Sequence, residues 1–241
     1  MIKTTKNSRN TEVITGIFSI LAGIALISTI ITRFEFISFF SSFNEDIDYL
    51  LDNIQLLKIN SIIWLITGLI ITVSASTFIV LLDSWHKLFS RLIGFFMILA
   101  AAMISVSGIK GLGIIEILTH FQDLDLPNNE YLKLSVFTLA REKELYILSS
   151  YSLLGIAFLS LGLFALRSRS MTILTGIVGV LTGIMLPVFS IIIPDSVLAD
   201  VGLAGGSITF MVIGVRILFN GLTLKKRSLK KLAEKAKTLL D

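Results

Sequence analysis

TGIFSILAGIAL, the stretch from Thr15 to Leu26, organises the chain because it returns twice. The closer copy is TGIVGVLTGIML, from Thr175 to Leu186, and the fainter one is IGFFMILAAAMI, from Ile93 to Ile104. Three columns of the alignment match: Gly16, Gly94 and Gly176; Leu21, Leu99 and Leu181; Gly23, Ala101 and Gly183. Each copy opens an apolar run of membrane-spanning length, so the repeat predicts three tandem helical hairpins.

Composition indicates a membrane protein. The 241 residues are 54% hydrophobic and 16% charged, with a mean hydropathy of +0.87, which is too apolar for an ordinary soluble domain. A helix that crosses about 30 Å of hydrocarbon needs roughly 20 mostly apolar residues. Six segments meet that test: 13–32, 61–82, 92–115, 146–166, 171–193 and 201–222. We expect an all-α, polytopic six-span domain over residues 1–222 and a basic amphipathic tail over 223–241.

Charge placement predicts the orientation. The N-terminus, the turns at 83–91 and 166–170, and the tail together hold fourteen Lys/Arg and four acids, whereas the opposite side is near −7. Loops rich in Lys and Arg stay in the cytoplasm, so we expect both termini there, in the plasma membrane of a prokaryotic cell. The basic face would adhere to anionic lipid, and the basic pI therefore requires no nucleic acid as a partner. The expected partners are the bilayer, other membrane proteins or a second copy of the chain.

The first outer loop is amphipathic. Asn44 can cap a helix over 44–57 whose first turn carries Glu45 and Asp46. One face of that helix is apolar, with Ile47, Leu50, Leu51, Ile54 and Leu57. Two roles stay open for this external helix: an interfacial helix that lies flat on the outer rim, or a lid over an outward-facing cavity.

Four polar residues are candidates for function: Arg216, Lys110, Glu116 and His120. Arg216 is the one charge well inside a predicted span, and such a residue is a functional hypothesis unless it snorkels to the interface. Lys110 and Glu116 are six residues apart, about 240° around a helix, so they are not expected to pair. The tetrad at 141–144 is expected to mark the water boundary before the fourth span.

Glycines are the expected helix-packing residues. Gly16 and Gly23 lie in the first span, and Gly176, Gly179 and Gly183 lie in the fifth. The spacing between Gly179 and Gly183 is that of the small-xxx-small pattern, which permits close approach of two helices.

The chain has few of the side chains that catalytic sites commonly use. The chain has no cysteine, and its two histidines, His86 and His120, fall on opposite predicted faces. A metal site or a serine nucleophile with its base is therefore not expected, and no cofactor motif is present. Each acid falls in a loop or near a predicted boundary, so an intramembrane coupling carboxylate is not expected either.

The layout over residues 10–222 resembles an uncharacterised prokaryotic membrane family, domain of unknown function 4386. The residues that carry the resemblance are Arg91-Leu92-Ile93-Gly94 before the third span, and Leu163 to Arg169 with Leu174-Thr175-Gly176 before the fifth. The Gly-rich hairpins are also similar to acid-resistance membrane proteins of the HdeD type. Either resemblance implies a six-helix fold, and neither implies a reaction.

The leading functional hypothesis is a non-enzymatic accessory or assembly subunit that binds a partner or lipid. The alternative is a small-molecule permease or exporter, for which a continuous polar cavity lined by Ser74, Ser152 and Arg216 would be diagnostic. A lesser alternative is a lipid-modifying enzyme that uses Glu116, His120, Arg141 and Glu142 at the outer interface.

Overall fold

The computed structural model describes residues 6–41, 47–83, 86–122, 130–167, 173–192 and 197–238, and within these ranges all regular structure is helical. The helices are α1 (Lys6–Ser41), α2 (Ile47–Asp52), α3 (Ile54–Asp83), α4 (Lys87–Gln122), α5 (Glu130–Arg167), α6 (Ile173–Ile191) and α7 (Val197–Thr238). Six of these described helices, all but α2, are long and apolar enough to cross a membrane. The predicted all-α class with six such helices is confirmed.

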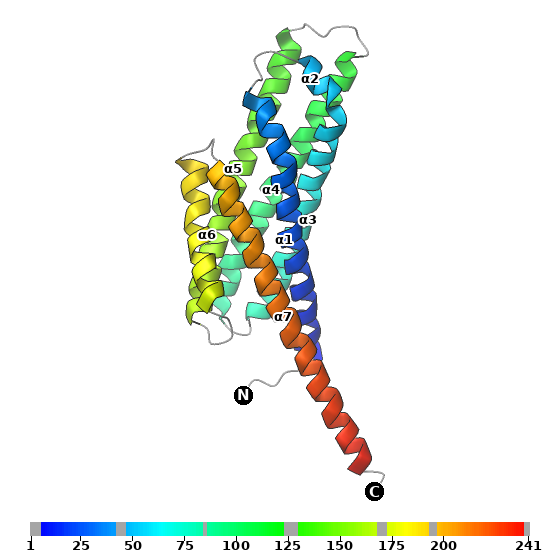
Figure 1. Cartoon of the computed structure of the whole chain (residues 1–241), viewed down its shortest axis with the longest axis vertical. Coiled ribbons are helices and arrows are strands. Elements are labelled where there is room, and N and C mark those ends of the chain that lie inside the picture. Colours follow the sequence, from blue (N-terminus) through cyan, green and yellow to red (C-terminus); the bar gives the residue numbers. More distant parts are fainter. Residues whose placement is uncertain are drawn as a thin grey trace.

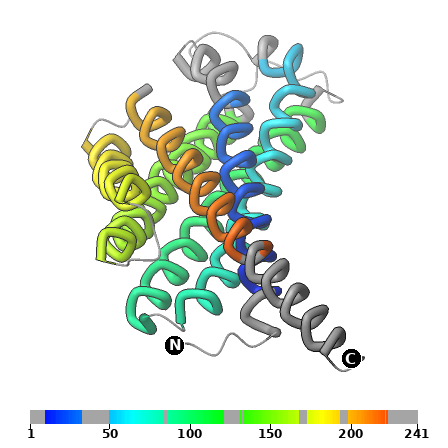
Figure 2. The backbone as a smooth tube through the Cα atoms, turned by 60° about the horizontal axis from the view of Figure 1, so that its bottom comes forward, coloured from blue at the N-terminus to red at the C-terminus, as the bar shows by residue number. Residues whose placement is uncertain are grey.

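The six long helices form a closed ring (Figures 1 and 2). Each packs on the next in chain order, from α1 on α3 through to α6 on α7, and α7 returns to pack on α1. Three antiparallel hairpins thus stand side by side around a common centre: α1 with α3, α4 with α5, and α6 with α7.

The three copies of the sequence repeat bury the same positions. The last residue of each copy, namely Leu26, Ile104 and Leu186, is fully buried. The shared leucine column points outward instead, since Leu21, Leu99 and Leu181 are 40%, 37% and 56% exposed. The repeat therefore corresponds to three helices, α1, α4 and α6, that turn equivalent faces toward the ring.

Small residues of the repeat lie where neighbouring hairpins meet. A Cβ built at Gly16 of α1 would lie 2.8 Å from Leu218 of α7, and one built at Gly176 of α6 would lie 2.6 Å from Leu166 of α5. Gly94 of α4 lies against α3 in the same way. In every copy the first glycine thus faces the second helix of the preceding hairpin, and the ring has an approximate threefold pattern.

Two apolar cores stack along the bundle. The larger, which we name the ring core, fills the ring and includes Trp64, Phe78, Tyr151, Phe158 and Phe210. The smaller, which we name the head core, comprises Leu50, Leu57, Ile114, Leu118, Val136 and Ala140. The head core exists because α4 and α5, with 36 and 38 residues, are roughly 54–57 Å long at the ordinary helical rise, far longer than a bilayer's hydrocarbon layer.

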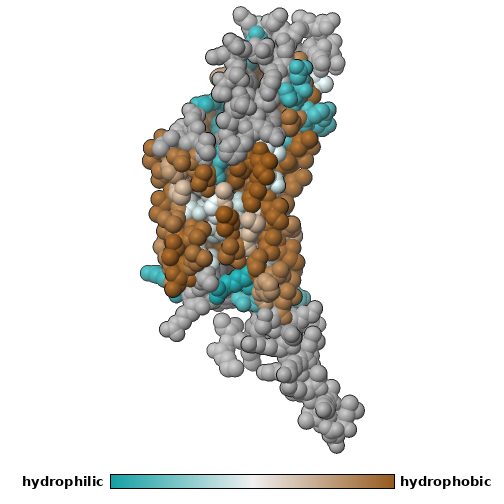
Figure 3. Space-filling view, in the orientation of Figure 1, coloured by the Kyte–Doolittle hydropathy of each residue, from teal (hydrophilic) through white to brown (hydrophobic). Residues whose placement is uncertain are grey.

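The surface of the ring is apolar and its interior holds polar side chains. Leu69, Phe95 and Ile173 are 59%, 56% and 71% exposed, and the face of the ring seen in Figure 3 carries a broad hydrophobic band with hydrophilic residues above and below it. Thr15, Ser19 and Ser207, in contrast, are fully buried. A soluble protein has the opposite distribution, so this surface suits lipid.

The outer loop differs from the single helix expected at 44–57. Residues 44–46 lie outside the described ranges, α2 ends at Asp52, and α3 begins at Ile54. Leu50 and Leu57 are buried in the head core, against the projecting ends of α4 and α5. Leu51 and Ile54 pack against the same core, whereas the side chain of Ile47 lies outside the described part; this face therefore packs on protein rather than lying flat, because α4 and α5 extend far enough to cover it.

The basic tail continues the last span. α7 is one helix through Thr238, and residues 239–241 lie outside the described ranges. In Figure 1 this helix runs past the end of the ring.

The glycine contacts can be tested with one substitution at two sites. We expect Gly183→Ala to destabilise the fold by about 1–3 kcal/mol, since its Cβ would lie 2.6 Å from the backbone Cα of Leu159. Gly113→Ala is the matched control: the nearest atom to its Cβ is 3.8 Å away, and alanine favours the helix by up to about 1 kcal/mol. Unfolding by a denaturing detergent in mixed micelles measures both, and equal stabilities for the two variants would contradict the packing account.

Candidate functional site

A chain of hydrogen bonds crosses the bundle where the head core meets the ring core. Lys143 Nζ of α5 donates to Asn60 Oδ1 of α3 at 2.8 Å, and Asn60 Nδ2 donates to Thr32 Oγ1 of α1 at 3.0 Å. Thr32 in turn donates to the carbonyl oxygen of Ser28 at 2.9 Å. Lys143 is 4% exposed and Asn60 is 2% exposed, so three helices are joined by a buried polar connection.

Small groups on α3 and α4 complete this region. Ser61 is fully buried, and its hydroxyl donates to the carbonyl oxygen of Leu57 at 2.7 Å. A Cβ at Gly111 of α4 would lie 3.3 Å from Lys143 Nζ, so the lysine ammonium rests against the α4 backbone. We name Thr32, Asn60, Ser61, Gly111 and Lys143 the polar layer.

The polar layer separates the two apolar cores. Along α5, Val136 and Ala140 belong to the head core, Lys143 follows, and Ile147 and Tyr151 belong to the ring core. The same order occurs on α3, where Leu57 precedes Asn60 and Trp64 follows. Since burying an ammonium group costs several kcal/mol, a lysine in this position is a functional candidate.

A second polar pair lies deeper. Tyr151 Oη of α5 donates to Asp200 Oδ1 of α7 at 3.3 Å, and both residues are at most 2% exposed. α5 and α7 are not neighbours in the ring, so this hydrogen bond spans its centre. Asp200 lies in the first turn of α7, where the free amides of the helix end favour a carboxylate.

Aromatic side chains fill the centre of the ring farther along. Phe210 of α7 contacts Phe158 of α5 edge-on, with ring centroids 4.9 Å apart, and Phe78 of α3 at 6.4 Å. All three are at most 1% exposed. These aromatics come from alternate helices of the ring and close its centre with apolar groups.

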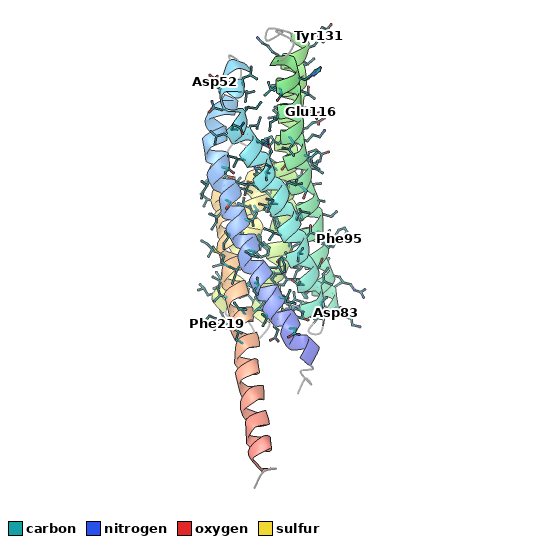
Figure 4. The ribbon with its side chains drawn as sticks, turned by 90° about the vertical axis from the view of Figure 1, so that its right-hand side faces the viewer. Asp52, Asp83, Phe95, Glu116, Tyr131 and Phe219 are labelled. Carbon is teal, nitrogen blue, oxygen red and sulfur yellow. The ribbon has the colours of Figure 1, made fainter. Side chains whose placement is uncertain are left out.

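The candidates taken from sequence lie elsewhere. Lys110 pairs with Glu142 of α5, both partly exposed, rather than with Glu116. Glu116 and His120 are exposed on the head, and Figure 4 places Glu116 and Tyr131 at the opposite end of the bundle from Asp83 and Phe219. Arg216 is half-buried on α7, far along the chain from Asp200. The ionic partner of Lys110, Glu142, thus lies outside this set of four.

Ser74, Ser152 and Arg216, the residues that would diagnose a polar cavity, lie apart. Ser152 bonds Ser190 of α6 at 2.7 Å, whereas Ser74 is fully buried on α3, which does not adjoin α6. The glycines named for packing do lie at helix contacts: Gly16 and Gly23 of α1 against α7, and Gly176, Gly179 and Gly183 of α6 against α5.

Two buried ionisable residues were missed by sequence reasoning. Lys143 was assigned to a water boundary, yet Val136, Ala140, Lys143, Ile147 and Tyr151 share one face of a helix at spacings of three and four. This helical spacing of apolar residues on either side of Lys143 is the sequence signal that predicts its burial. Asp200 was placed just before the sixth span, whose apolar helix in fact begins at Leu198. Asp200 thus lies in the first turn of α7, near the boundary as expected, but its side chain is buried rather than exposed to water.

No cluster of three or more His, Cys, Asp or Glu that could hold a metal ion occurs in the described part of the chain. No family model matches the chain, and neither does any curated protein or solved structure. The two family resemblances stay predictions.

The polar layer can be tested through Asn60. We expect Asn60→Ala to lower the free energy of unfolding by about 1–3 kcal/mol, since Lys143 and Thr32 each lose a buried hydrogen-bond partner. Asn220→Ala, the same change at an exposed position of α7, is the control and should leave stability within about 0.5 kcal/mol. Detergent unfolding of the two variants decides this, and a silent Asn60→Ala would argue against the hydrogen-bond chain.

Proposed function

We propose that this chain is an integral membrane protein with six crossings, both termini in the cytoplasm, and a non-enzymatic role in binding a lipid or a protein partner. The observation that carries the proposal is the closed ring: its outer surface is apolar, and its centre is filled by Phe78, Phe158 and Phe210. A filled centre suits a rigid scaffold better than a conduit.

Close contacts between helices also support a rigid scaffold. Backbones approach closely at Gly16 with Gly214 and at Gly162 with Gly179, where a Cβ would come within about 3 Å of the partner backbone. Such contacts give TM helices extensive van der Waals packing, which is the main source of their association in lipid. The plasma membrane of a prokaryote is the proposed location, on the strength of the charge asymmetry.

A permease is the second candidate, and one observation favours it. Lys143, Tyr151 and Asp200 are ionisable residues buried in the outer half of the bundle, and intramembrane ionisable groups mark transport pathways in many proteins. A transporter built this way would have to open the aromatic centre during its cycle.

Orientation can be tested directly because the chain has no cysteine. We expect Thr119→Cys, exposed on the head, to react with a membrane-impermeant maleimide added to intact cells. Asn220→Cys, exposed near the other end, should react only after the membrane is permeabilised. The reverse pattern, or labelling of both in intact cells, would contradict cytoplasmic termini.

The accessibility of introduced cysteines to a water-soluble reagent distinguishes the scaffold from the permease, and the test requires no known substrate. Ser74 and Ser150 are fully buried; Ser74 Oγ makes no hydrogen bond to the described residues, and Ser150 Oγ donates to the carbonyl oxygen of Ile147 in its own helix, so Cys is a mild change at either site. For a static ring we expect neither cysteine to react with a water-soluble thiol reagent, while Thr119→Cys in parallel samples reacts fully. Reaction of Ser150→Cys from outside together with Ser74→Cys from inside would overturn the scaffold and support the permease.

A further inference from the structure

We propose that the part of α5 that extends beyond α6 docks a helix of another protein, which packs on α5 as α6 does and carries an Asp or Glu opposite Arg141. This inference rests on the proposed function, because it names the surface through which the scaffold would bind a protein partner. The surface, which we name the open α5 face, consists of Leu134, Thr138, Arg141, Leu145 and Leu148.

The contact between α5 and α6 follows a regular spacing. On α5 it includes Ser152, Gly155, Leu159, Gly162 and Leu166. These positions alternate between steps of three and four residues, which keeps one side of a helix against its neighbour. The same alternation continues toward the start of α5 through Leu148, Leu145, Arg141, Thr138 and Leu134. The open α5 face is therefore a direct continuation of the surface on which α6 packs.

α6 is too short to cover this continuation. It has 19 residues, about 28 Å at the ordinary helical rise, and Ser190, next to its last residue, bonds Ser152 of α5. Leu145 and Leu134 precede Ser152 by seven and 18 residues, about 10 and 27 Å along α5. In Figure 1 the α6–α7 hairpin likewise ends well below the tops of α4 and α5. Since α6 alone matches a hydrocarbon layer of about 30 Å, lipid tails around α6 would not reach Leu134.

The open α5 face is largely apolar and exposed. Leu134 and Leu145 are 64% and 53% exposed, and Thr138 and Arg141 are exposed as well. The other side of the same stretch, with Val136 and Ala140, is buried in the head core. Single exposed leucines are common on protein surfaces, but here they prolong an existing helix contact at its own spacing. Such a face is suited to a further helix.

Arg141 determines the kind of helix that fits. A guanidinium group binds a carboxylate through two parallel hydrogen bonds, and Glu142, the acid beside Arg141, pairs with Lys110 of α4. A second copy of the chain would lie in the membrane in the same orientation, so its α5 would pair in parallel and set Arg141 against Arg141. Like charges at the centre of a contact oppose binding. The charge therefore favours a different protein with an acidic residue at this level.

The experiment uses the full-length chain in membranes of the cells that produce it. Leu134 or Leu145 is replaced by the photoreactive residue p-benzoylphenylalanine, and crosslinked peptides are identified by mass spectrometry after irradiation. Ile59 of α3, an apolar residue that is 52% exposed, is the control position. We expect both positions of the open α5 face, and not Ile59, to crosslink to one helical segment of another protein that contains an Asp or a Glu.

Charge exchange tests the pairing with Arg141. We expect Arg141→Glu to lower the crosslinking yield by about tenfold, because it sets two like charges against each other. Replacing the partner's acid with Arg should then restore the yield. Lys58→Glu reverses a charge at an exposed position of α3 and should leave the yield unaltered.

The outcomes separate this proposal from the scaffold role. It is overturned if crosslinks form only between two copies or only with lipid, if neither position exceeds Ile59, or if folded Arg141→Glu crosslinks as the parent does. Size-exclusion profiles and thermal midpoints confirm that each variant is folded. Failed crosslinking together with unreactive Ser74→Cys and Ser150→Cys would overturn the docking face and leave the static ring. Reaction of both cysteines from opposite sides would overturn the scaffold itself.

Discussion

Contact between α1 and α7 is the interaction on which the rest of the structure depends, because it turns a row of three hairpins into a ring. Gly16 approaches the carbonyl oxygen of Gly214, and Gly23 approaches that of Ser207, each at a Cβ distance below 3 Å. Both pairs are seven residues apart on their helices, so small residues recur along one seam. Without that seam, Phe210 would lose its place against Phe78 and Phe158, and the ring centre would open.

Polar side chains inside the ring divide into two kinds. Most buried hydroxyls bond a carbonyl oxygen of their own helix, as Ser19 does to Thr15 and Ser207 does to Leu203. Such groups are satisfied before any helix packs, so they cost little in an apolar environment and specify no partner. Asn60, Lys143, Tyr151 and Asp200 differ, since each bonds another helix. Together with hydroxyl bonds between helices, such as Thr15 to the carbonyl oxygen of Thr77 and Ser152 to Ser190, these residues add directional contacts to the apolar packing.

Much of the fold was predictable because it follows from length, hydropathy and one repeat. The six helices and the equivalent faces of α1, α4 and α6 could be derived from Thr15–Leu26 and its copies. The head could not, because its existence depends on how far α4 and α5 continue beyond their apolar segments. The site was harder to predict than the fold, as Lys143 shows. A charged residue marks a water boundary only where its helix ends, and α5 runs three turns before it reaches Lys143.

The ring closes between the first and last of its helices, and this has a consequence for biogenesis. Ribosomes deliver the chain from its N-terminus, so in the proposed membrane topology α1 would enter the bilayer long before α7 is made. The face of α1 that carries Gly16 and Gly23 would lack its partner throughout that interval, while α3, α4, α5 and α6 are added. In that order of synthesis the α1–α7 contact would be the last long-range contact to form, and a chain truncated before residue 197 would lack the helix that packs on Gly16 and Gly23.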